Sequence, residues 1–419
     1  MEHIFLRVRL ILISFSVVTD LLFYFSLLHL ISSGFSFSPF YFNLVFWMIP
    51  LVFIFFFLSF KFDSSRRQSR ILANIYRISG FFMTIYLPKI IFLTFHLANM
   101  IFNLITRGFI LILNLILSDP VSYRPFGFFT YTGLGLAIIL FILLVYGALL
   151  GRFFFKTEKI TLGFSNLPVS FNNFRIVQIS DIHLGSWYRK EKKMAAAVSL
   201  VNGLAPDLIL FTGDLVNNFS EETNGWNHIL KKTSARYGKF SILGNHDYGD
   251  YWDWKNEAEK QENIQLLYRA HENMGFRLLL NQAETIGINR HEIGIIGVEN
   301  WGKPPFEQYG DLRKAIADLK PVPFKILLSH DPSHWQAEVH EKTDISLTLS
   351  GHTHAMQFGF KIGRYQWSPV KYIYKLWSGL YGNNGQYLYV NRGLGSLGFP
   401  GRIGMRPEIT CITLISSDK

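Results

Sequence analysis

Long apolar runs dominate the first 150 residues of the chain, and charged side chains are rare there. Three runs reach the roughly 20 apolar residues that a helix needs to cross the hydrocarbon core of a bilayer. They cover residues 4–31, 40–60 and 130–150. A soluble domain has no use for runs of this length. We therefore predict a helical membrane domain over residues 1–155, followed by a soluble domain over residues 156–419.

A fourth apolar segment, residues 71–118, is longer than one crossing needs and contains the interruptions Pro88, Lys89, His96 and Arg107. Either it is one long or broken helix, which gives four spans, or it is a tight hairpin, which gives five. We favour four spans. Basic residues gather in residues 61–77, which is typical of a loop retained in the cytoplasm and is also compatible with attraction to anionic lipid headgroups. Four spans then place the soluble domain in the cytoplasm.

From residue 174 onward the pattern changes to short β-rich runs between polar and glycine-rich loops, with helical segments between several of them. The predicted strands are residues 175–179, 208–211, 239–243, 292–298, 324–328, 345–349, 386–390 and 409–415. The predicted helices are residues 189–201 and 311–319, with a charged helical insertion at 254–275. This order indicates an α/β domain.

Five of these strands run directly into polar clusters at their C-terminal ends. The clusters are Ser180-Asp181-Ile182-His183, Gly213-Asp214, Gly244-Asn245-His246-Asp247, Ser329-His330-Asp331 and Gly351-His352-Thr353-His354. In open α/β sheets this edge is where ligands bind, because rigid strands hold side chains that still face solvent. Carboxylate, imidazole and amide oxygen donors suit divalent ions such as Mn, Fe, Zn or Mg. The sequence therefore predicts a metal centre at this edge.

The spacing inside the clusters supports metal binding. In an extended segment residues i and i+2 point to the same side, so Asp181 with His183, and His352 with His354, are each suited to chelation. About seven good donors are present, which is more than one ion needs, and a carboxylate such as Asp214 can bridge two ions at the roughly 3.5–4 Å separation of two-metal phosphatases. We therefore expect two divalent ions.

In this order, the five clusters resemble the calcineurin-like metallophosphoesterase superfamily, over residues 174–419. The flanking segments 298–302, 310–312 and 391–395 resemble the bacterial branch that joins this domain to N-terminal membrane spans. The resemblance implies two packed mixed β-sheets flanked by helices, and a multi-pass protein of the bacterial cytoplasmic membrane. It departs at Ala355-Met356, where relatives commonly carry two glycines, so Met356 adds bulk near the predicted site.

The resemblance also implies a role for each candidate residue. One ion is assigned to Asp181, His183, Asp214 and His354, and the other to Asp214, Asn245, His330 and His352. His246 is placed beside the scissile phosphate as a catalytic group. Asp247 either orients His246 or caps the following segment.

Two arginines of the C-terminal glycine-rich loops, Arg392 and Arg402, are candidate phosphate ligands, the alternative being loop anchors. The aromatic insertion at residues 248–260 is a candidate cap for the active site, a surface for the membrane interface, or simple packing. A single cysteine, Cys411, excludes an intramolecular disulfide.

The function that these features favour is hydrolysis of a phosphate ester through a hydroxide that bridges the two ions, with a lipid-linked ester as one candidate substrate. A metal-loaded domain that binds or senses phosphate is the alternative, and a transporter with a regulatory domain is a third reading. The chain has a formal net charge of +11, but no basic stripe with interleaved aromatics stands out in the soluble half, so we expect no nucleic-acid partner.

Overall fold

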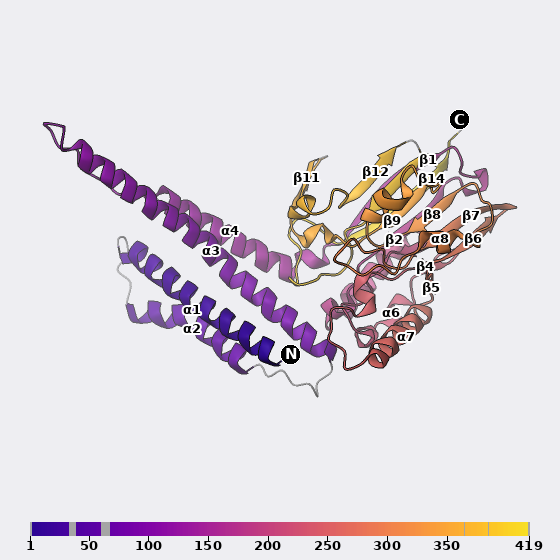
Figure 1. Ribbon diagram of the computed structural model, residues 1–419, viewed down its shortest axis with the longest axis horizontal. Helices are drawn as coiled ribbons and strands as arrows, with labels where there is room; N and C mark the ends of the chain where they lie inside the picture. Colours follow the sequence, from indigo (N-terminus) through magenta and orange to yellow (C-terminus); the bar gives the residue numbers. More distant parts are fainter. Residues whose placement is uncertain (1, 33–38, 60–67, 364, 384, 418–419) are drawn as a thin grey trace. The chain divides into compact units, whose positions relative to one another are not determined.

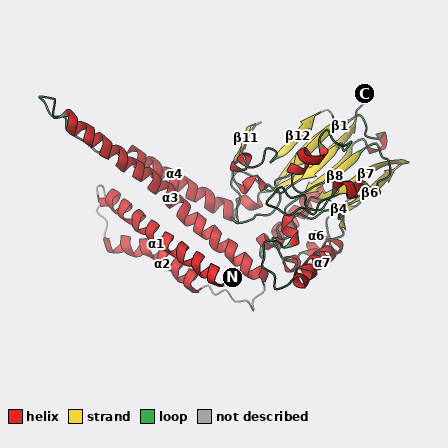
Figure 2. Cartoon of the chain, viewed as in Figure 1, coloured by secondary structure: helices red, strands yellow, loops and turns green. Residues whose placement is uncertain are grey.

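The computed structural model describes residues 2–32, 39–59, 68–363, 365–383 and 385–417 (Figures 1 and 2). The chain divides into two compact units. One comprises residues 1–67 and 77–146, and is called the membrane unit below. The other comprises residues 68–76 and 147–419, and is called the catalytic unit. Each is described by itself.

The membrane unit is built from long apolar helices. They are α1 (Glu2–Ser32), α2 (Pro39–Ser59), α3 (Gln68–Leu113) and α4 (Phe128–Leu149); the first residues of α3 and the last residues of α4 belong to the catalytic unit. Among the described residues, three segments are long and apolar enough to cross a membrane, namely Arg9–Leu28, Ile71–Leu113 and Phe128–Phe153, while Phe40–Phe55 is a shorter apolar helix. Four crossings therefore stay a prediction.

Residues 68–113 form one continuous helix of 46 residues that contains Pro88. The hairpin alternative for residues 71–118 is therefore wrong, and the reason is local: no turn residues break the helical hydrogen-bonding pattern after Pro88, and a proline inside a helix bends it more readily than it reverses the chain. At 1.5 Å per residue the helix is about 70 Å long, more than twice the thickness of a bilayer core. Part of α3 must therefore extend beyond the hydrocarbon.

The interior of the membrane unit contains a buried ion pair. Asp20 of α1 lies 2.5 Å from Lys89 Nζ of α3 and accepts a hydrogen bond of 2.9 Å from the Tyr86 hydroxyl. Lys89 also lies over the rings of Phe23 and Phe46. Charges inside an apolar bundle are costly unless paired, so this cluster ties α1 to α3.

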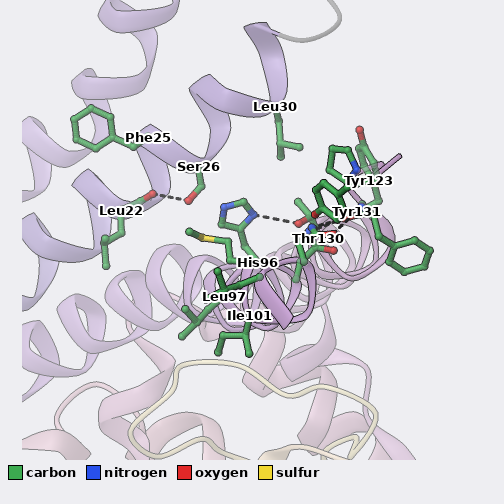
Figure 3. Close-up of a pocket in the computed structure, with 17 residues that line it drawn as sticks. Leu22, Phe25, Ser26, Leu30, His96, Leu97, Ile101, Tyr123, Thr130 and Tyr131 are labelled. Atoms are coloured by element: carbon green, nitrogen blue, oxygen red, sulfur yellow. Dashed lines mark hydrogen bonds between the residues drawn. The ribbon is translucent and has the colours of Figure 1, made fainter. Parts of the chain in front are cut away.

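A pocket of about 980 Å³ opens in the membrane unit among residues of α1, α3 and the start of α4 (Figure 3). Its wall is mostly apolar. His96 Nδ1 lies 3.1 Å from the Thr130 hydroxyl, and Asn99 donates a hydrogen bond of 2.9 Å to the Phe126 carbonyl. Among the described residues the buried Oδ1 atom of Asn99 has no hydrogen-bond partner. The pocket thus combines an apolar wall with a buried acceptor.

Two six-stranded mixed sheets form the centre of the catalytic unit. The first has the strand order β1 (Lys156–Phe164), β14 (Glu408–Ser416), β2 (Phe174–Ile179), β3 (Leu208–Phe211), β4 (Lys239–Ser241), β5 (Arg277–Leu278). The second has the order β12 (Gly379–Asn383), β13 (Gln386–Val390), β9 (Leu347–Ser350), β8 (Lys325–Leu328), β7 (His291–Gly297), β6 (Gln282–Ile288). A separate two-stranded sheet pairs β10 (Phe360–Ile362) with β11 (Tyr365–Trp367).

The two sheets pack face to face through one apolar core. Ile176, Leu210 and Ile412 of the first sheet and Ile326 and Leu349 of the second belong to the same buried cluster. The outer face of the first sheet is covered by α5 (Glu191–Gly203), α6 (Asn227–Leu230) and α7 (Glu257–Asn273), and that of the second by α8 (Leu312–Ile316) and the turn Trp335–Val339. The predicted fold of two packed mixed sheets flanked by helices is confirmed.

Each of the eight predicted strands is present, within a few residues of its predicted ends. Strand β1 was missed, because residues 151–159 look like a short basic exit from the last membrane span. It forms because it pairs in parallel with β14 over nine residues, from Lys156 opposite Glu408 to Phe164 opposite Ser416. The local sequence pattern around β1 does not indicate this pairing, because β14 lies about 250 residues further along the chain.

Candidate metal centre

The polar clusters meet where five strands of the two sheets end. Asp181, Asp214 and Asn245 follow β2, β3 and β4 of the first sheet, whereas His330 and His352 follow β8 and β9 of the second. These strands are parallel neighbours within each sheet, so their C-terminal ends share one edge. The structure therefore brings the predicted ligands together at the C-terminal ends of strands from both sheets.

The backbone at these strand ends is strained. Asp181, His183, Asp214, His352 and His354 all have positive φ, between 46° and 71°. Such conformations cost non-glycine residues about 1–3 kcal/mol each and persist where the surrounding structure imposes them, often at functional sites. They turn the side chains toward one point instead of letting them alternate along the strand direction.

Two glycines make room for this convergence. A Cβ atom on Gly244 would lie 2.2 Å from Asp214 Oδ1, and one on Gly351 would lie 2.0 Å from Ser180 Oγ and 2.3 Å from Asp181 Oδ2. No real side chain tolerates such distances. Only glycine therefore lets the backbone before Asn245 and His352 pass this close to the carboxylates.

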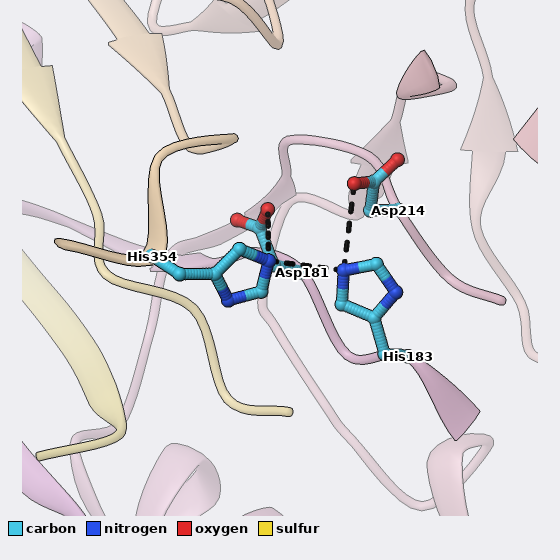
Figure 4. A group of neighbouring side chains, drawn as sticks. All are labelled: Asp181, His183, Asp214 and His354. Carbon is cyan, nitrogen blue, oxygen red and sulfur yellow. Dashed lines mark hydrogen bonds and ion pairs between the residues drawn. The ribbon is translucent and has the colours of Figure 1, made fainter. Parts of the chain in front are cut away.

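The tightest group of candidate ligands comprises four buried side chains, Asp181, His183, Asp214 and His354 (Figure 4). One ligand atom from each lies within 4.8 Å of the others. His183 Nε2 lies 3.0 Å from His354 Nε2 and 3.5 Å from Asp214 Oδ2. His354 Nε2 lies 3.3 Å from Asp181 Oδ1. This is the set predicted to hold the first ion.

The remaining predicted ligands lie on the other side of Asp214. His330 Nε2 lies 3.2 Å from Asp214 Oδ2, and His352 Nδ1 lies 2.8 Å from Asn245 Oδ1. The rings of His330 and His352 are 5.1 Å apart. Asp214 is thus next to both groups, which is the position that a bridging carboxylate requires.

Protonation in the metal-free protein suits cation binding. Burial lowers the pKa of His183 to about 3 and that of His352 to about 4, and holds the pKa of His354 well below its usual range. These imidazoles are therefore neutral at physiological pH, which is the form that ligates metals. Burial also lowers the pKa of His330, but the charge of Asp214 outweighs it and raises that pKa to about 10.

The donor set fits divalent ions. The buried Nε2 atom of His330 has no hydrogen-bond partner among the described residues, although it lies next to Asp214. A proton on His330 occupies the position that a cation would take over. Its Nδ1 atom lies 2.7 Å from the Thr212 carbonyl, which fixes the ring so that Nε2 faces the cluster. Backbone carbonyls commonly orient metal-binding histidines in this way.

His246 differs from the other histidines of the centre. Its Nδ1 atom lies 2.7 Å from the Asn217 carbonyl, and its backbone N–H donates a hydrogen bond of 3.0 Å to Asp214 Oδ1. Its ring lies 5.0 Å from that of His183 and 4.7 Å from that of Tyr251. Its ring thus lies beside the candidate ligands, and a role other than metal ligation stays a prediction.

Asp247 holds the ligand loops and does not contact His246 through its side chain. Its Oδ2 atom accepts hydrogen bonds from the backbone N–H groups of Asp214 and Gly244, at 2.8 and 2.9 Å. Its Oδ1 atom accepts from Leu215 and Val216, at 2.9 and 3.2 Å. Of the two predicted roles, this geometry favours the structural one, because one carboxylate joins the loops after β3 and β4.

The two arginines predicted to bind phosphate are buried and engaged elsewhere. Arg392 forms ion pairs with Glu158 of β1 at 2.9 Å and with Glu408 of β14 at 2.6 Å. Arg402 donates to the carbonyls of Gly395 and Arg392, and its Nη2 atom lies 3.1 Å from His354 Nδ1. This geometry supports the alternative of loop anchors, because the donors that a phosphate would need are already used.

Two tyrosine hydroxyls contact the candidate ligands. Asn245 Nδ2 donates a hydrogen bond of 2.7 Å to the Tyr251 hydroxyl, and His352 Nε2 lies 2.8 Å from the Tyr374 hydroxyl. Tyr251 belongs to the insertion at residues 248–260, so this part of the insertion does lie over the centre. Tyr374 is 22 residues beyond His352, and no spacing rule marks it.

Comparison with known proteins identifies the domain. Residues 174–356 match the family described as calcineurin-like phosphoesterase. An uncharacterized metallophosphoesterase of Bacillus subtilis is 32% identical over 276 residues, which cover 63% of this chain and 86% of that protein. A transmembrane protein with metallophosphoesterase domain from Danio rerio is 33% identical over 296 residues, covering 69% of this chain and 63% of that protein.

A third relative has a named substrate. It is a UDP-2,3-diacylglucosamine pyrophosphatase of Chlamydia trachomatis, 29% identical over 281 residues, which cover 55% of this chain and 81% of that protein. The order of the ligand clusters in the chain, the fold of two packed sheets and these relatives agree. The chain belongs to the calcineurin-like metallophosphoesterases and is a metal-dependent hydrolase.

Proposed function

We propose that the chain is a membrane-anchored phosphoesterase that uses two divalent ions to hydrolyse a phosphate ester or anhydride of a lipid-linked substrate. The observation that carries this proposal is the convergence of seven candidate ligands, with Asp214 between the two groups and His246 next to them. Asp181, His183, Asp214 and His354 would hold one ion. Asp214, Asn245, His330 and His352 would hold the other.

The bound ions would lower the pKa of water and neutralise the charge on phosphate oxygens. The chain itself would position the leaving group. Because the Asn217 carbonyl accepts a hydrogen bond from Nδ1 of His246, the proton on this ring stays on Nδ1, and Nε2 is the atom that exchanges a proton with the substrate. When both nitrogens are protonated, Nε2–H is able to donate to the departing oxygen.

Three observations support a lipid-linked substrate. The relative from Chlamydia trachomatis is named for a diacylated sugar nucleotide, and this chain joins its catalytic domain to several apolar helices, whereas one helix is enough for an anchor. The pocket of the membrane unit adds a large apolar cavity with the acceptor Asn99 Oδ1 in its lining. A hydrocarbon chain that bears a hydroxyl or amide group would match this pocket, since the chain would contact the apolar wall and the polar group would donate to Asn99 Oδ1.

The alternative is a metal-loaded domain that binds or senses phosphate without hydrolysing it. Such a domain would be expected to have lost a bridging or catalytic residue. Here Asp214 and His246 are both retained, together with the loops that hold them. This completeness favours catalysis.

The test is a hydrolysis screen of the full-length protein in detergent and in lipid nanodiscs, loaded with Mn, Fe, Zn or Mg. The substrates are p-nitrophenyl phosphate, bis-p-nitrophenyl phosphate, phospholipids and lipid-linked sugar nucleotides. We expect two ions per chain by elemental analysis and turnover of at least one lipid-linked compound.

The matched variants are Asp214→Asn, which removes a bridging carboxylate, and His291→Asn, which changes an exposed histidine whose ring contacts Ser170. The first should lose both ions and activity, and the second neither. No more than one ion at saturation would contradict the dinuclear centre. Two ions with no hydrolysis of any ester would favour the phosphate-binding alternative.

A further inference from the structure

The C-terminal part of the catalytic domain contains a long segment without acidic residues. Residues 355–407 include no Asp or Glu, whereas Lys and Arg occur seven times. Of these, Arg392 and Arg402 are buried in the contacts described above. Lys361, Lys371 and Lys375 lie in the first half of the segment, which also contains the small sheet of β10 and β11. The residues around this small sheet are therefore basic along the chain; Lys361 pairs with Glu158 of β1 at 3.3 Å, and Lys371 and Lys375 are exposed.

The small sheet presents one apolar face. In its antiparallel register Phe360 lies opposite Trp367, Lys361 opposite Gln366, and Ile362 opposite Tyr365. Because side chains alternate between the two faces of a strand, the two outer pairs share one face and the middle pair occupies the other. The ring of Phe360 stacks on those of Trp367 and Tyr365, at 5.8 and 6.1 Å between centroids.

This apolar face is open to solvent. The exposed fraction is 41% for Phe360, 73% for Ile362 and 65% for Tyr365. Tyr372 and Ile373, which follow β11 in the chain, are also exposed, at 76% and 58%. Single exposed apolar residues are common, but a sheet face made only of large apolar side chains is costly in water and indicates a surface that is covered in use.

The same segment is joined to the metal centre. Ser368, directly after β11, donates a hydrogen bond of 2.7 Å to the carbonyl of Ala355, which follows the candidate ligand His354. Tyr374 contacts the ring of His352 through its hydroxyl. Ala355, Val370 and Trp377 form a small buried core that holds these parts together. The segment that carries the apolar face is thus in contact with the loops of His352 and His354, two candidate metal ligands.

We propose that the apolar face of β10 and β11 inserts into the headgroup region of an anionic bilayer. The bilayer is the occupant for two reasons. Strand β1 begins at Lys156, seven residues after α4 ends at Leu149, and so short a connection keeps the domain at the membrane surface. Aromatic side chains with lysines and no acidic residues are the composition that binds at the interface of negatively charged membranes.

Docking of this face on a bilayer does not depend on which ester the centre hydrolyses. It is tested with full-length protein reconstituted into vesicles of phosphatidylcholine, with or without phosphatidylglycerol. Ile362→Cys is labelled with an environment-sensitive fluorophore, and nitroxide groups on the lipid acyl chains serve as quenchers. Cys411 is buried, so the unsubstituted protein gives the labelling background.

Two labelled variants are controls. Lys361→Cys places the label one residue away on the opposite face of the same strand, and Glu292→Cys places it on an exposed position of β7. We expect quenching at position 362 to be at least about twice that at position 361, since a residue on an interfacial apolar face lies roughly 5–10 Å deep in the headgroup and acyl boundary. Phosphatidylglycerol should strengthen this difference, and high salt should reduce it.

Equal quenching at positions 361, 362 and 292 would overturn the proposal. So would quenching that is indifferent to phosphatidylglycerol and salt, because the basic residues would then play no part. A label at position 362 that is shielded from the lipid quenchers and shows energy transfer between protein copies would assign the face to self-association instead. None of these outcomes depends on enzymatic activity, so they are distinguishable from a failure of the proposed function.

Discussion

His246 is the residue whose role is most open to a direct test. Its ring contacts a carbonyl on one side and lies beside the metal centre on the other, without joining the ligand pairs. We predict that His246→Asn leaves the metal content at two ions per chain. The rate on esters with poor leaving groups should fall by about 10²–10⁴, the usual contribution of general acid catalysis.

Esters with good leaving groups should be affected less, because they need no proton from the enzyme. Elemental analysis and kcat for p-nitrophenyl and alkyl phosphates measure the two effects separately. Loss of an ion would show that His246 is a ligand. An equal rate loss for both esters would indicate that it only positions the phosphate.

Asp247 acts on the structure of the centre. Its two oxygens accept four backbone N–H groups of the ligand loops, and an amide has one acceptor oxygen where a carboxylate has two. We predict that Asp247→Asn lowers the free energy of unfolding by about 1–3 kcal/mol, the cost of leaving buried donors unpaired. Denaturant unfolding of the metal-free protein measures this.

The matched control is Asp311→Asn. Asp311 accepts one backbone N–H, from Lys314, at the exposed start of α8, where asparagine is an equally good cap. Its stability should change little. If both variants behave alike, the four hydrogen bonds of Asp247 do not hold the loops in solution.

At the level of elements, the turn after His354 has a backbone conformation that favours glycine, although this chain carries Ala355 and Met356 there. Ala355, Met356 and Gln357 have φ of 48°, 52° and 58°, a left-handed run in which glycine is favoured. This is the position where the resemblance led us to expect two glycines. The sequence keeps the turn but uses larger side chains, and Met356 remains 47% exposed.

We predict that Met356→Gly is more stable than Met356→Ala by about 1 kcal/mol, since alanine retains the cost of a left-handed conformation and glycine does not. Both variants remove the thioether, so a comparison of their unfolding free energies isolates the backbone effect. If Met356 also narrows the entry, both should accept bulkier esters than the parent. Equal stability of the two variants would contradict the strain, whatever the effect on substrates.

For the whole molecule, the orientation of the catalytic domain is the open prediction. Part of the basic cluster at residues 61–77 lies outside the described residues, and α2 contains only the shorter apolar segment Phe40–Phe55. We still propose four crossings and a cytoplasmic catalytic domain, because α3 is one continuous helix and Arg152, Lys156 and Lys159 follow the last span.

A reporter fused to the C-terminus tests this topology in a bacterial host. Green fluorescence from a fused fluorescent protein is expected, together with little activity from a fused alkaline phosphatase. Strong alkaline phosphatase activity would place the domain outside the cytoplasm. A fusion in the loop between α3 and α4 should give the opposite result and serves as the internal control.

The sequence by itself determined the chemistry of the site and the class of the fold. Each ligand cluster is local, since Asp181 and His183, or His352 and His354, are neighbours that carry their donor atoms and their strand-end position with them. Short β-rich runs between polar and glycine-rich loops likewise predicted the eight strands, because the composition of a buried strand and of its flanking turns is local.

Only the tertiary structure decided the contacts that orient those donors. The carbonyl of Asn217 beside His246 and the hydroxyl of Tyr374 beside His352 come from loops with no motif. Glu158 lies 234 residues before its partner Arg392, and this contact favours the loop-anchor role that the sequence had left as the alternative to phosphate binding. A backbone carbonyl or a distant carboxylate acts through its position in space, and position is a property of packing between segments rather than of residue type.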